Sequence, residues 1–198
     1  MTTVKFPTST VGWTAFATGI ASILATILII LFYTAGGPFG TLNDIFNGIA
    51  AILSGILAWM LRPVFHVNSS AQWILTAVAS IGAIVAVIGS ILIVYDFTGW
   101  VLAGWYTTLG YAFVGLWLLA FSHSARQEKT LPQNLPTLGF IAGSLMTVGV
   151  IVIPAIVMGI DSTESTPWYI NLGYSGFLGT YLLYPAWAVW LGRTLLSQ

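Results

Sequence analysis

Six apolar stretches, each long enough to cross a lipid bilayer, occupy most of this 198-residue chain. They cover about residues 11–33, 43–62, 72–95, 99–121, 137–160 and 168–191. A transmembrane helix needs roughly 20 mainly apolar residues, so six of them leave room only for short loops. Backbone groups in lipid must be satisfied internally, and runs such as Ile27–Leu31 lack the strict alternation of a barrel strand. The sequence therefore predicts an all-α integral membrane protein with a single transmembrane domain, residues 1–198.

The composition agrees with that fold class and narrows the partners. Hydrophobic residues make up 58% of the chain and charged residues only 5%, whereas a soluble domain has about a quarter charged residues. The formal net charge is zero, so the chain offers no basic patch for nucleic acid. Cysteine is absent, which excludes disulfides and thiolate metal sites. The partner that the composition does predict is the lipid bilayer.

The charged residues predict the orientation in the membrane. If six helices alternate across the bilayer, every basic residue falls on one side, namely Lys5, Arg62, Arg126, Lys129 and Arg193. Short loops rich in Lys and Arg stay in the cytoplasm, so both termini are expected there and the protein in the cell membrane. Three of the five acidic residues fall in the opposite loops: Asp96, Asp161 and Glu164. These acidic loops either attract cations to an outer vestibule or are simply solvated.

An internal repeat is visible in the second half of the chain. Residues Trp105–Tyr111 and Trp168–Tyr174 share five of seven identities and lie 63 positions apart, each near the start of a predicted span. The simplest interpretation is three tandem two-helix hairpins in one bundle, related by an axis along the membrane normal. The alternative is that Trp and Tyr recur because membrane interfaces favour them. Small-residue pairs such as Gly139 and Gly143 predict close helix packing in either case.

Asp44 is the acidic residue nearest to a span interior, at the start of the predicted second span. One hypothesis is structural: Asn43 or Thr41 caps the helix, and Asp44 in its first turn interacts with the helix dipole. The other hypothesis is functional. Asp44 and Asn47 are three positions apart and share a helix face, so they could point into an outer cavity that holds a cation or polar solute.

Two tyrosines extend the functional hypothesis to other spans. Tyr111 and Tyr174 lie deeper than the interfacial aromatic residues, and their hydroxyls need hydrogen-bond partners. A cavity between the second, fourth and sixth spans would bring both together with Asp44 and Asn47. These four residues are the candidate cavity or cation site.

The prolines and histidines of the sequence do not indicate a specific function. Pro154 and Pro185 interrupt the last two spans and act either as gating hinges or as accommodations to the bundle shape. His66 and His123 have no partner at metal-ligand spacing. Nucleophile-elbow and phosphate-loop motifs are absent from the sequence. We therefore expect no catalytic, cofactor or metal site, and no enzyme activity.

Two functional hypotheses remain open at this point. The first is a non-enzymatic scaffold or accessory subunit that associates within the bilayer, as a homo-oligomer or in a larger membrane complex. Its basis is the number of small-residue packing faces and the scarcity of polar groups in the spans. The alternative is a small-solute or cation transporter or channel with an outer cavity around Asp44.

Overall fold

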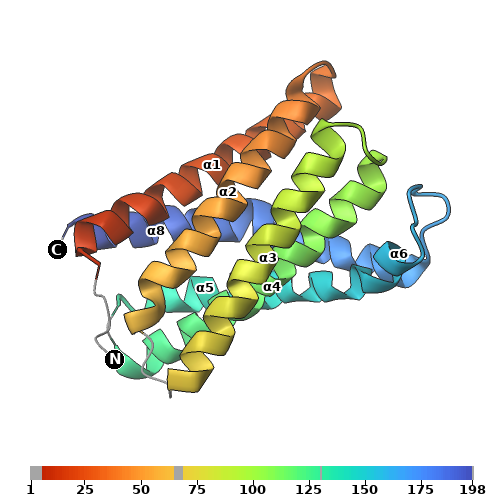
Figure 1. Ribbon diagram of the computed structural model, residues 1–198. Coiled ribbons are helices and arrows are strands. Elements are labelled where there is room, and N and C mark those ends of the chain that lie inside the picture. Colours follow the sequence, from red (N-terminus) through yellow and green to blue (C-terminus); the bar gives the residue numbers. More distant parts are fainter. Residues whose placement is uncertain (1–5, 65–68, 130, 198) are drawn as a thin grey trace.

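The computed structural model describes residues 6–64, 69–129 and 131–197, and all regular structure in these ranges is helical (Figure 1). Five helical stretches are long and apolar enough to cross a membrane: Thr8–Ala35, Phe39–Leu61, Ser70–Val94, Trp100–Glu128 and Asn134–Val157. The prediction of an all-helical chain is therefore confirmed. These five stretches are compatible with a multi-pass membrane protein.

The first four long helices are continuous and the fifth stretch is not. The continuous helices are α1 (Thr8–Ala35), α2 (Phe39–Leu61), α3 (Ser69–Val94) and α4 (Trp100–Glu128), with a short 3-10 turn, η1 (Arg62–Val64), after α2. The fifth stretch joins α5 (Asn134–Thr147), the 3-10 turn η2 (Val148–Val152) and α6 (Ile153–Val157). Pro154 stands at the start of α6, where its missing N–H needs no helical partner.

The end of the chain departs from the continuous helix that the sequence predicts for residues 168–191. It consists of the 3-10 segment η3 (Trp168–Tyr174), α7 (Ser175–Phe177), the π-helical segment η4 (Leu178–Leu183) and α8 (Tyr184–Leu196). Pro185 explains part of this irregularity, because it cannot donate a hydrogen bond to the carbonyl of Tyr181 four residues earlier. That carbonyl instead accepts a hydrogen bond from the Thr26 hydroxyl of α1, at 2.9 Å.

The helices form a closed ring. Each long helix packs against the next one in the chain, and α8 returns to pack along α1 (Figure 1). Close approach depends on glycine at several crossings. A Cβ atom at Gly82 of α3 would lie 2.5 Å from the carbonyl oxygen of Gly110 on α4, and one at Gly143 of α5 would lie 2.7 Å from that of Gly115. The close packing predicted from small residues is therefore present, with backbones in near contact.

Large apolar side chains also cover the outside of the ring. The face of α2 that points out of the ring carries isoleucines, and the inward face of its first half carries small and polar residues. Exposed isoleucines on α2 and α3 are Ile45, Ile49, Ile52, Ile56, Ile74, Ile81, Ile84, Ile88 and Ile91. Ala50, Ala51, Ala79 and Ala86 are fully buried. Large apolar side chains outside and small ones inside are what a helix needs when lipid is its solvent and packing holds the bundle together.

Four aromatic residues fill the core between α4 and α8. Trp117 stacks on Phe121 with ring centroids 5.5 Å apart, Tyr184 stacks on Trp187 at 5.8 Å, and the two tryptophans meet edge to face at 6.3 Å. All four are almost fully buried. Trp117 and Trp187 therefore point inward rather than towards a membrane interface, where tryptophan is often found. We call these four residues the aromatic core cluster.

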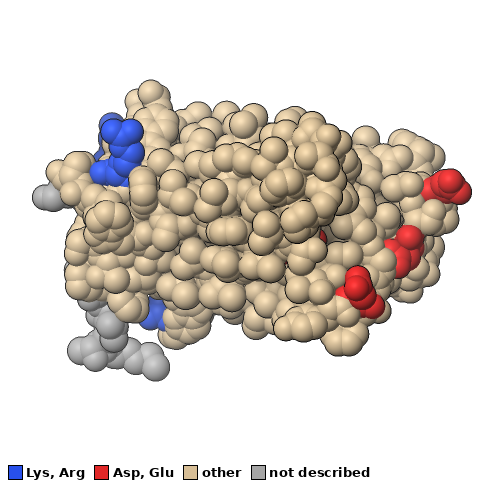
Figure 2. All heavy atoms as spheres, turned by 90° about the horizontal axis from the view of Figure 1, so that it is seen from above, with Lys and Arg blue, Asp and Glu red and all other residues tan. Residues whose placement is uncertain are grey.

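Opposite charges gather at opposite ends of the molecule (Figure 2). The end that holds the start of α1 and the end of α8 carries the described basic residues, Arg62, Arg126, Lys129 and Arg193, together with Glu128. Asp96, Asp161 and Glu164 lie at the other end. Lys5 and His66 lie outside the described residues. We refer to the two ends as the basic end and the acidic end.

Asp161 ties two loops together at the acidic end. Its carboxylate accepts hydrogen bonds from the backbone N–H of Gly99 (2.7 Å) and Leu102 (2.9 Å) and from the Thr98 hydroxyl (3.2 Å). These N–H groups belong to the first turn of α4, which no neighbouring side chain caps. Asp161 thus caps α4 from a distant loop. Desolvation raises its pKa, but the hydrogen bonds outweigh this effect and the pKa lies below its ordinary value.

Replacing Asp161 with alanine should lower the stability of the protein by about 1 kcal/mol, the usual cost of a lost helix cap. Because folding lowers the pKa of Asp161, its contribution is fully present above about pH 4 and is lost as the pH falls through the folded-state pKa. Thermal unfolding in detergent at neutral and acidic pH measures both effects. Glu164→Ala removes an acid from the same loop and should leave the unfolding temperature unchanged. Equal effects of the two substitutions would contradict the capping role.

Candidate functional site

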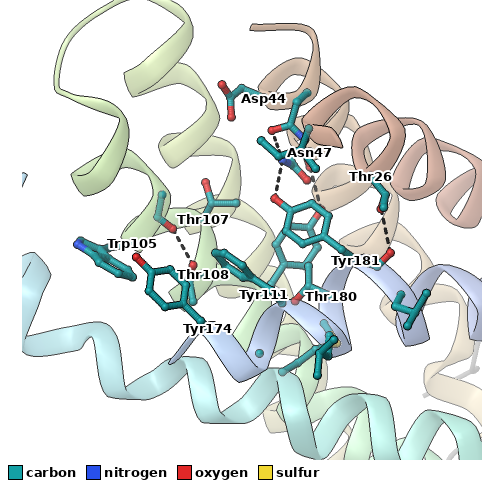
Figure 3. A pocket seen from close by; sticks show the side chains of 18 of the residues that line it. Thr26, Asp44, Asn47, Trp105, Thr107, Thr108, Tyr111, Tyr174, Thr180 and Tyr181 are labelled. Carbon is teal, nitrogen blue, oxygen red and sulfur yellow. Dashed lines mark hydrogen bonds between the residues drawn. The ribbon is translucent and has the colours of Figure 1, made fainter. Parts of the chain in front are cut away.

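A cavity of about 450 Å³ lies in the half of the ring nearest the acidic end. Its walls are the end of α1, the starts of α2 and α4, and the irregular segment from η3 to η4, with Met146 of α5 below (Figure 3). A volume of this size fits a small organic molecule. The cavity therefore forms where the last part of the chain departs from α-helical geometry.

All four candidate residues from the sequence line this cavity. Asp44 and Asn47 project from α2, Tyr111 comes from α4, and Tyr174 ends η3 (Figure 3). Tyr111 is buried and Tyr174 is partly exposed. The structure therefore brings together residues that are up to 130 positions apart in the chain.

The structural hypothesis for Asp44 is wrong. α2 begins at Phe39, with Pro38 in the N-cap position and no side-chain cap, so Asp44 belongs to the second turn. Asn43 does not cap the helix either, because its amide donates a hydrogen bond to the carbonyl of Ala25 on α1, at 2.8 Å. The helix starts four residues earlier than predicted because Pro38 fixes the backbone at its N-terminus.

Asn47 is the centre of a hydrogen-bond network that joins three walls of the cavity. Its amide donates to the Tyr181 hydroxyl of η4 (3.1 Å) and to the side-chain oxygen of Asn43 (3.2 Å). Its backbone carbonyl accepts a hydrogen bond from the Tyr111 hydroxyl of α4, at 2.9 Å. Interhelical hydrogen bonds of this kind hold membrane helices together where lipid offers no polar partner. Asn47 therefore fixes the shape of the cavity wall.

Asp44 stands beside this network but takes no part in it. Among the described residues, no hydrogen bond or ion pair engages its half-buried carboxylate. A carboxylate inside a helical bundle of this kind is costly unless it is paired or has a function. The cavity thus contains a carboxyl group that has no partner in the described part of the chain.

Aromatic rings make up much of the remaining wall. Trp105 of α4 lies against Tyr174 with ring centroids 5.7 Å apart, and Phe177 of α7 contacts both Tyr174 and Tyr181. The faces of such rings attract cations, most strongly where water is excluded. Aromatic walls around one carboxylate suit an organic cation better than a metal ion. A Ca²⁺ or Mg²⁺ site needs about six oxygen ligands, and the described residues contain no cluster of three or more Asp, Glu, His or Cys.

The cavity ends before it reaches the basic end. Below Tyr181, the Tyr184 hydroxyl donates a 2.7 Å hydrogen bond to Ser54 of α2, and the aromatic core cluster fills the space beyond. Tyr184 and Ser54 are both fully buried. Among the described residues, these packed side chains therefore close the cavity towards the basic end.

Several residues that line the cavity were not singled out from the sequence. Asn43 is one helical turn before Asn47, so the spacing that linked Asp44 with Asn47 could also have indicated it. Thr26 carries no local signal, because its bond to Tyr181 depends on the carbonyl that Pro185 leaves free.

The two histidines take no part in the cavity that the described residues form. His123 is exposed and pairs with Gln127, while His66 lies outside the described residues.

Fold and site together define a helical protein whose described residues form five long apolar helical stretches and line an acidic, aromatic cavity. No protein-family model, no curated protein and no solved structure matches the chain. The function must therefore be argued from the cavity itself.

Proposed function

We propose that the protein is a multi-pass membrane protein that binds a small organic cation in this cavity and acts as a carrier for such solutes. The observation that carries the proposal is the Asp44 carboxylate, which lines a 450 Å³ cavity and has no ionic partner among the described residues. A bound ammonium group would neutralise this charge, and the aromatic walls would contact its methyl or methylene groups. The packed side chains between the cavity and the basic end favour a carrier over an open channel.

The proposal includes six spans, with η3 to α8 as the sixth, and both termini in the cytoplasm. In its support, α8 runs along α1, Arg193 lies near its end at the basic end, and Asp161 precedes η3 at the acidic end. Short basic segments are retained in the cytoplasm, which would place the cavity on the outer side. The arrangement as three repeated hairpins stays a prediction. The two copies of its sequence signature differ in structure, since Trp105 is buried in α4 and Trp168 is exposed in η3.

Single cysteines can test the orientation, because the chain has no cysteine of its own. We expect Ser162→Cys to react with a membrane-impermeant maleimide on intact cells. Ser9→Cys and Ser197→Cys should react only after the membrane is permeabilised. Labelling of Ser9→Cys from outside would contradict the proposed orientation.

Ligand binding can be tested with tetramethylammonium as the probe. Purified protein in lipid nanodiscs should show a saturable change in tryptophan fluorescence, because Trp100 and Trp105 line the cavity. Gly104→Phe should abolish the response. A Cβ atom at Gly104 meets nothing within 4 Å, so the new ring would extend into the cavity without displacing the fold. Ile84→Phe places the same ring on the exposed face of α3, away from the cavity, and should bind as the unaltered protein does.

The outcome also separates the two functional hypotheses. Uptake of labelled tetramethylammonium into proteoliposomes would establish transport as well as binding. If the probe neither binds nor moves, and the protein copurifies in mild detergent with a second copy or another membrane protein, the scaffold hypothesis is favoured. The exposed isoleucines of α2 and α3 would then be the surface that the partner covers.

A further inference from the structure

One side of the cavity lies between α1 and the irregular segment of the last part of the chain. Towards the basic end these elements are in tight contact: a Cβ atom at Gly19 would lie 3.0 Å from the carbonyl oxygen of Pro185. Further towards the acidic end, the hydrogen bond from the Thr26 hydroxyl to the Tyr181 carbonyl joins the same two elements. From there towards the acidic end, residues of both elements line the cavity.

Several of these lining residues are also among the exposed apolar residues of the molecule. Ile30 of α1 is 57% exposed, and Leu178 and Leu182 of η4 are 57% and 60% exposed. A residue that both lines a cavity and is this exposed stands at an opening. The opening therefore faces sideways, out of the ring, and its edges are aliphatic like the isoleucine faces of α2 and α3.

The end of the cavity nearest the acidic loops is partly covered. Tyr33 in the last turn of α1 and Trp100 in the first turn of α4 meet edge to face, with ring centroids 6.3 Å apart. Both residues line the cavity, and α1 and α4 are not neighbours in the ring. This contact joins two walls of the cavity at the end nearest the acidic loops.

We infer that this side opening is a lateral portal to the bilayer, and that the ligand is an amphipathic ammonium compound with an alkyl chain. This inference rests on the proposed function and specifies its ligand. The ammonium group would lie at Asp44 among the aromatic rings, and the chain would leave between Ile30 and Leu178. An anionic amphiphile does not fit, because its head group would meet the unpaired carboxylate. A purely polar cation would leave the aliphatic edges without a partner.

The test compares tetramethylammonium with decyltrimethylammonium, which carries the same head group on an alkyl chain. In nanodiscs we expect the longer compound to half-saturate the protein at an aqueous concentration lower by about tenfold or more, because buried methylenes add to its affinity. A decyltrimethylammonium derivative with a diazirine at the chain end should label residues 29–33 and 177–182 on illumination. Excess tetramethylammonium should suppress this labelling, since both compounds compete for Asp44.

Two matched variants locate the portal. Leu182→Trp narrows the opening and should reduce the advantage of the longer compound over tetramethylammonium by about tenfold. Ile84→Trp places the same side chain at an equally exposed position on α3, 60% in each case, and should change neither value.

Equal half-saturating concentrations for the two compounds would contradict the proposal of a lateral portal but not the proposal of cation binding. Labelling mainly on the exposed face of α3 and insensitive to tetramethylammonium would contradict the lateral portal as well. If tetramethylammonium itself does not bind, the proposed function fails rather than the portal alone.

Discussion

Asp44→Asn is expected to weaken tetramethylammonium binding at least tenfold and, at the same time, to stabilise the empty protein. The substitution keeps the shape of the side chain and removes only its charge. Loss of one partner from a partly desolvated charge pair costs about 2–5 kcal/mol, and each 1.4 kcal/mol is tenfold in affinity. In the empty protein the carboxylate has no such partner among the described residues, so the substitution removes the cost of holding this group in a partly desolvated site.

The opposite signs of these two effects make the test specific. A residue that only supports the fold would lose stability and binding together. Fluorescence titration measures the affinity, and thermal unfolding without ligand measures the stability. Asp96→Asn removes an exposed carboxylate from a loop at the same end of the molecule and should alter neither quantity. Unchanged binding in Asp44→Asn would show that Asp44 is not the cation site.

Much of the helical fold was predictable because hydropathy marks the long apolar stretches that form the long helices. The predicted spans agree with α1 to α4 to within a few residues at most ends, and Asp96 adopts a left-handed backbone conformation in the turn before α4. The last part of the chain was not predictable in this way. Its average hydropathy resembles that of a helix, but Pro185 cannot donate to the carbonyl of Tyr181, and the Thr26 hydroxyl of another helix donates to it instead.

For the candidate site, too, the sequence predicted what depends on spacing along one helix but not what depends on contacts between helices. Asp44 and Asn47 were accessible to sequence reasoning because their spacing puts them on one helix face. Tyr111 and Tyr174 followed from their depth in the spans. The missing information was what each residue contacts. Asn43 looked like a helix cap but bonds to α1, and Asp161 looked like a solvated loop acid but caps α4. Such contacts depend on the arrangement of the ring, which local spacing does not encode.

Gly110→Ala is expected to cause the largest loss of stability among single-methyl changes on α4. A Cβ atom at this position would lie 2.5 Å from the carbonyl oxygen of Gly82 and 2.7 Å from the Cβ atom of Ala86, both on α3. These atoms belong to a helix backbone or are fixed to it, so the two helices must move apart. Overpacking of this kind costs about 1–3 kcal/mol and here exceeds the gain in helix propensity.

Gly104→Ala provides the matched control, because it adds the same methyl group to the same helix. A Cβ atom at Gly104 meets nothing within 4 Å, so only the gain in helix propensity remains, up to about 1 kcal/mol. Both variants share the gain in helix propensity, so unfolding in the same detergent should separate them by the overpacking cost, about 1–3 kcal/mol. Gly82→Ala acts on the same contact from α3, so adding it to Gly110→Ala should cost less than the sum of the single changes. Strict additivity would mean that α3 and α4 do not share one close contact, and the packing at this crossing would then need another explanation.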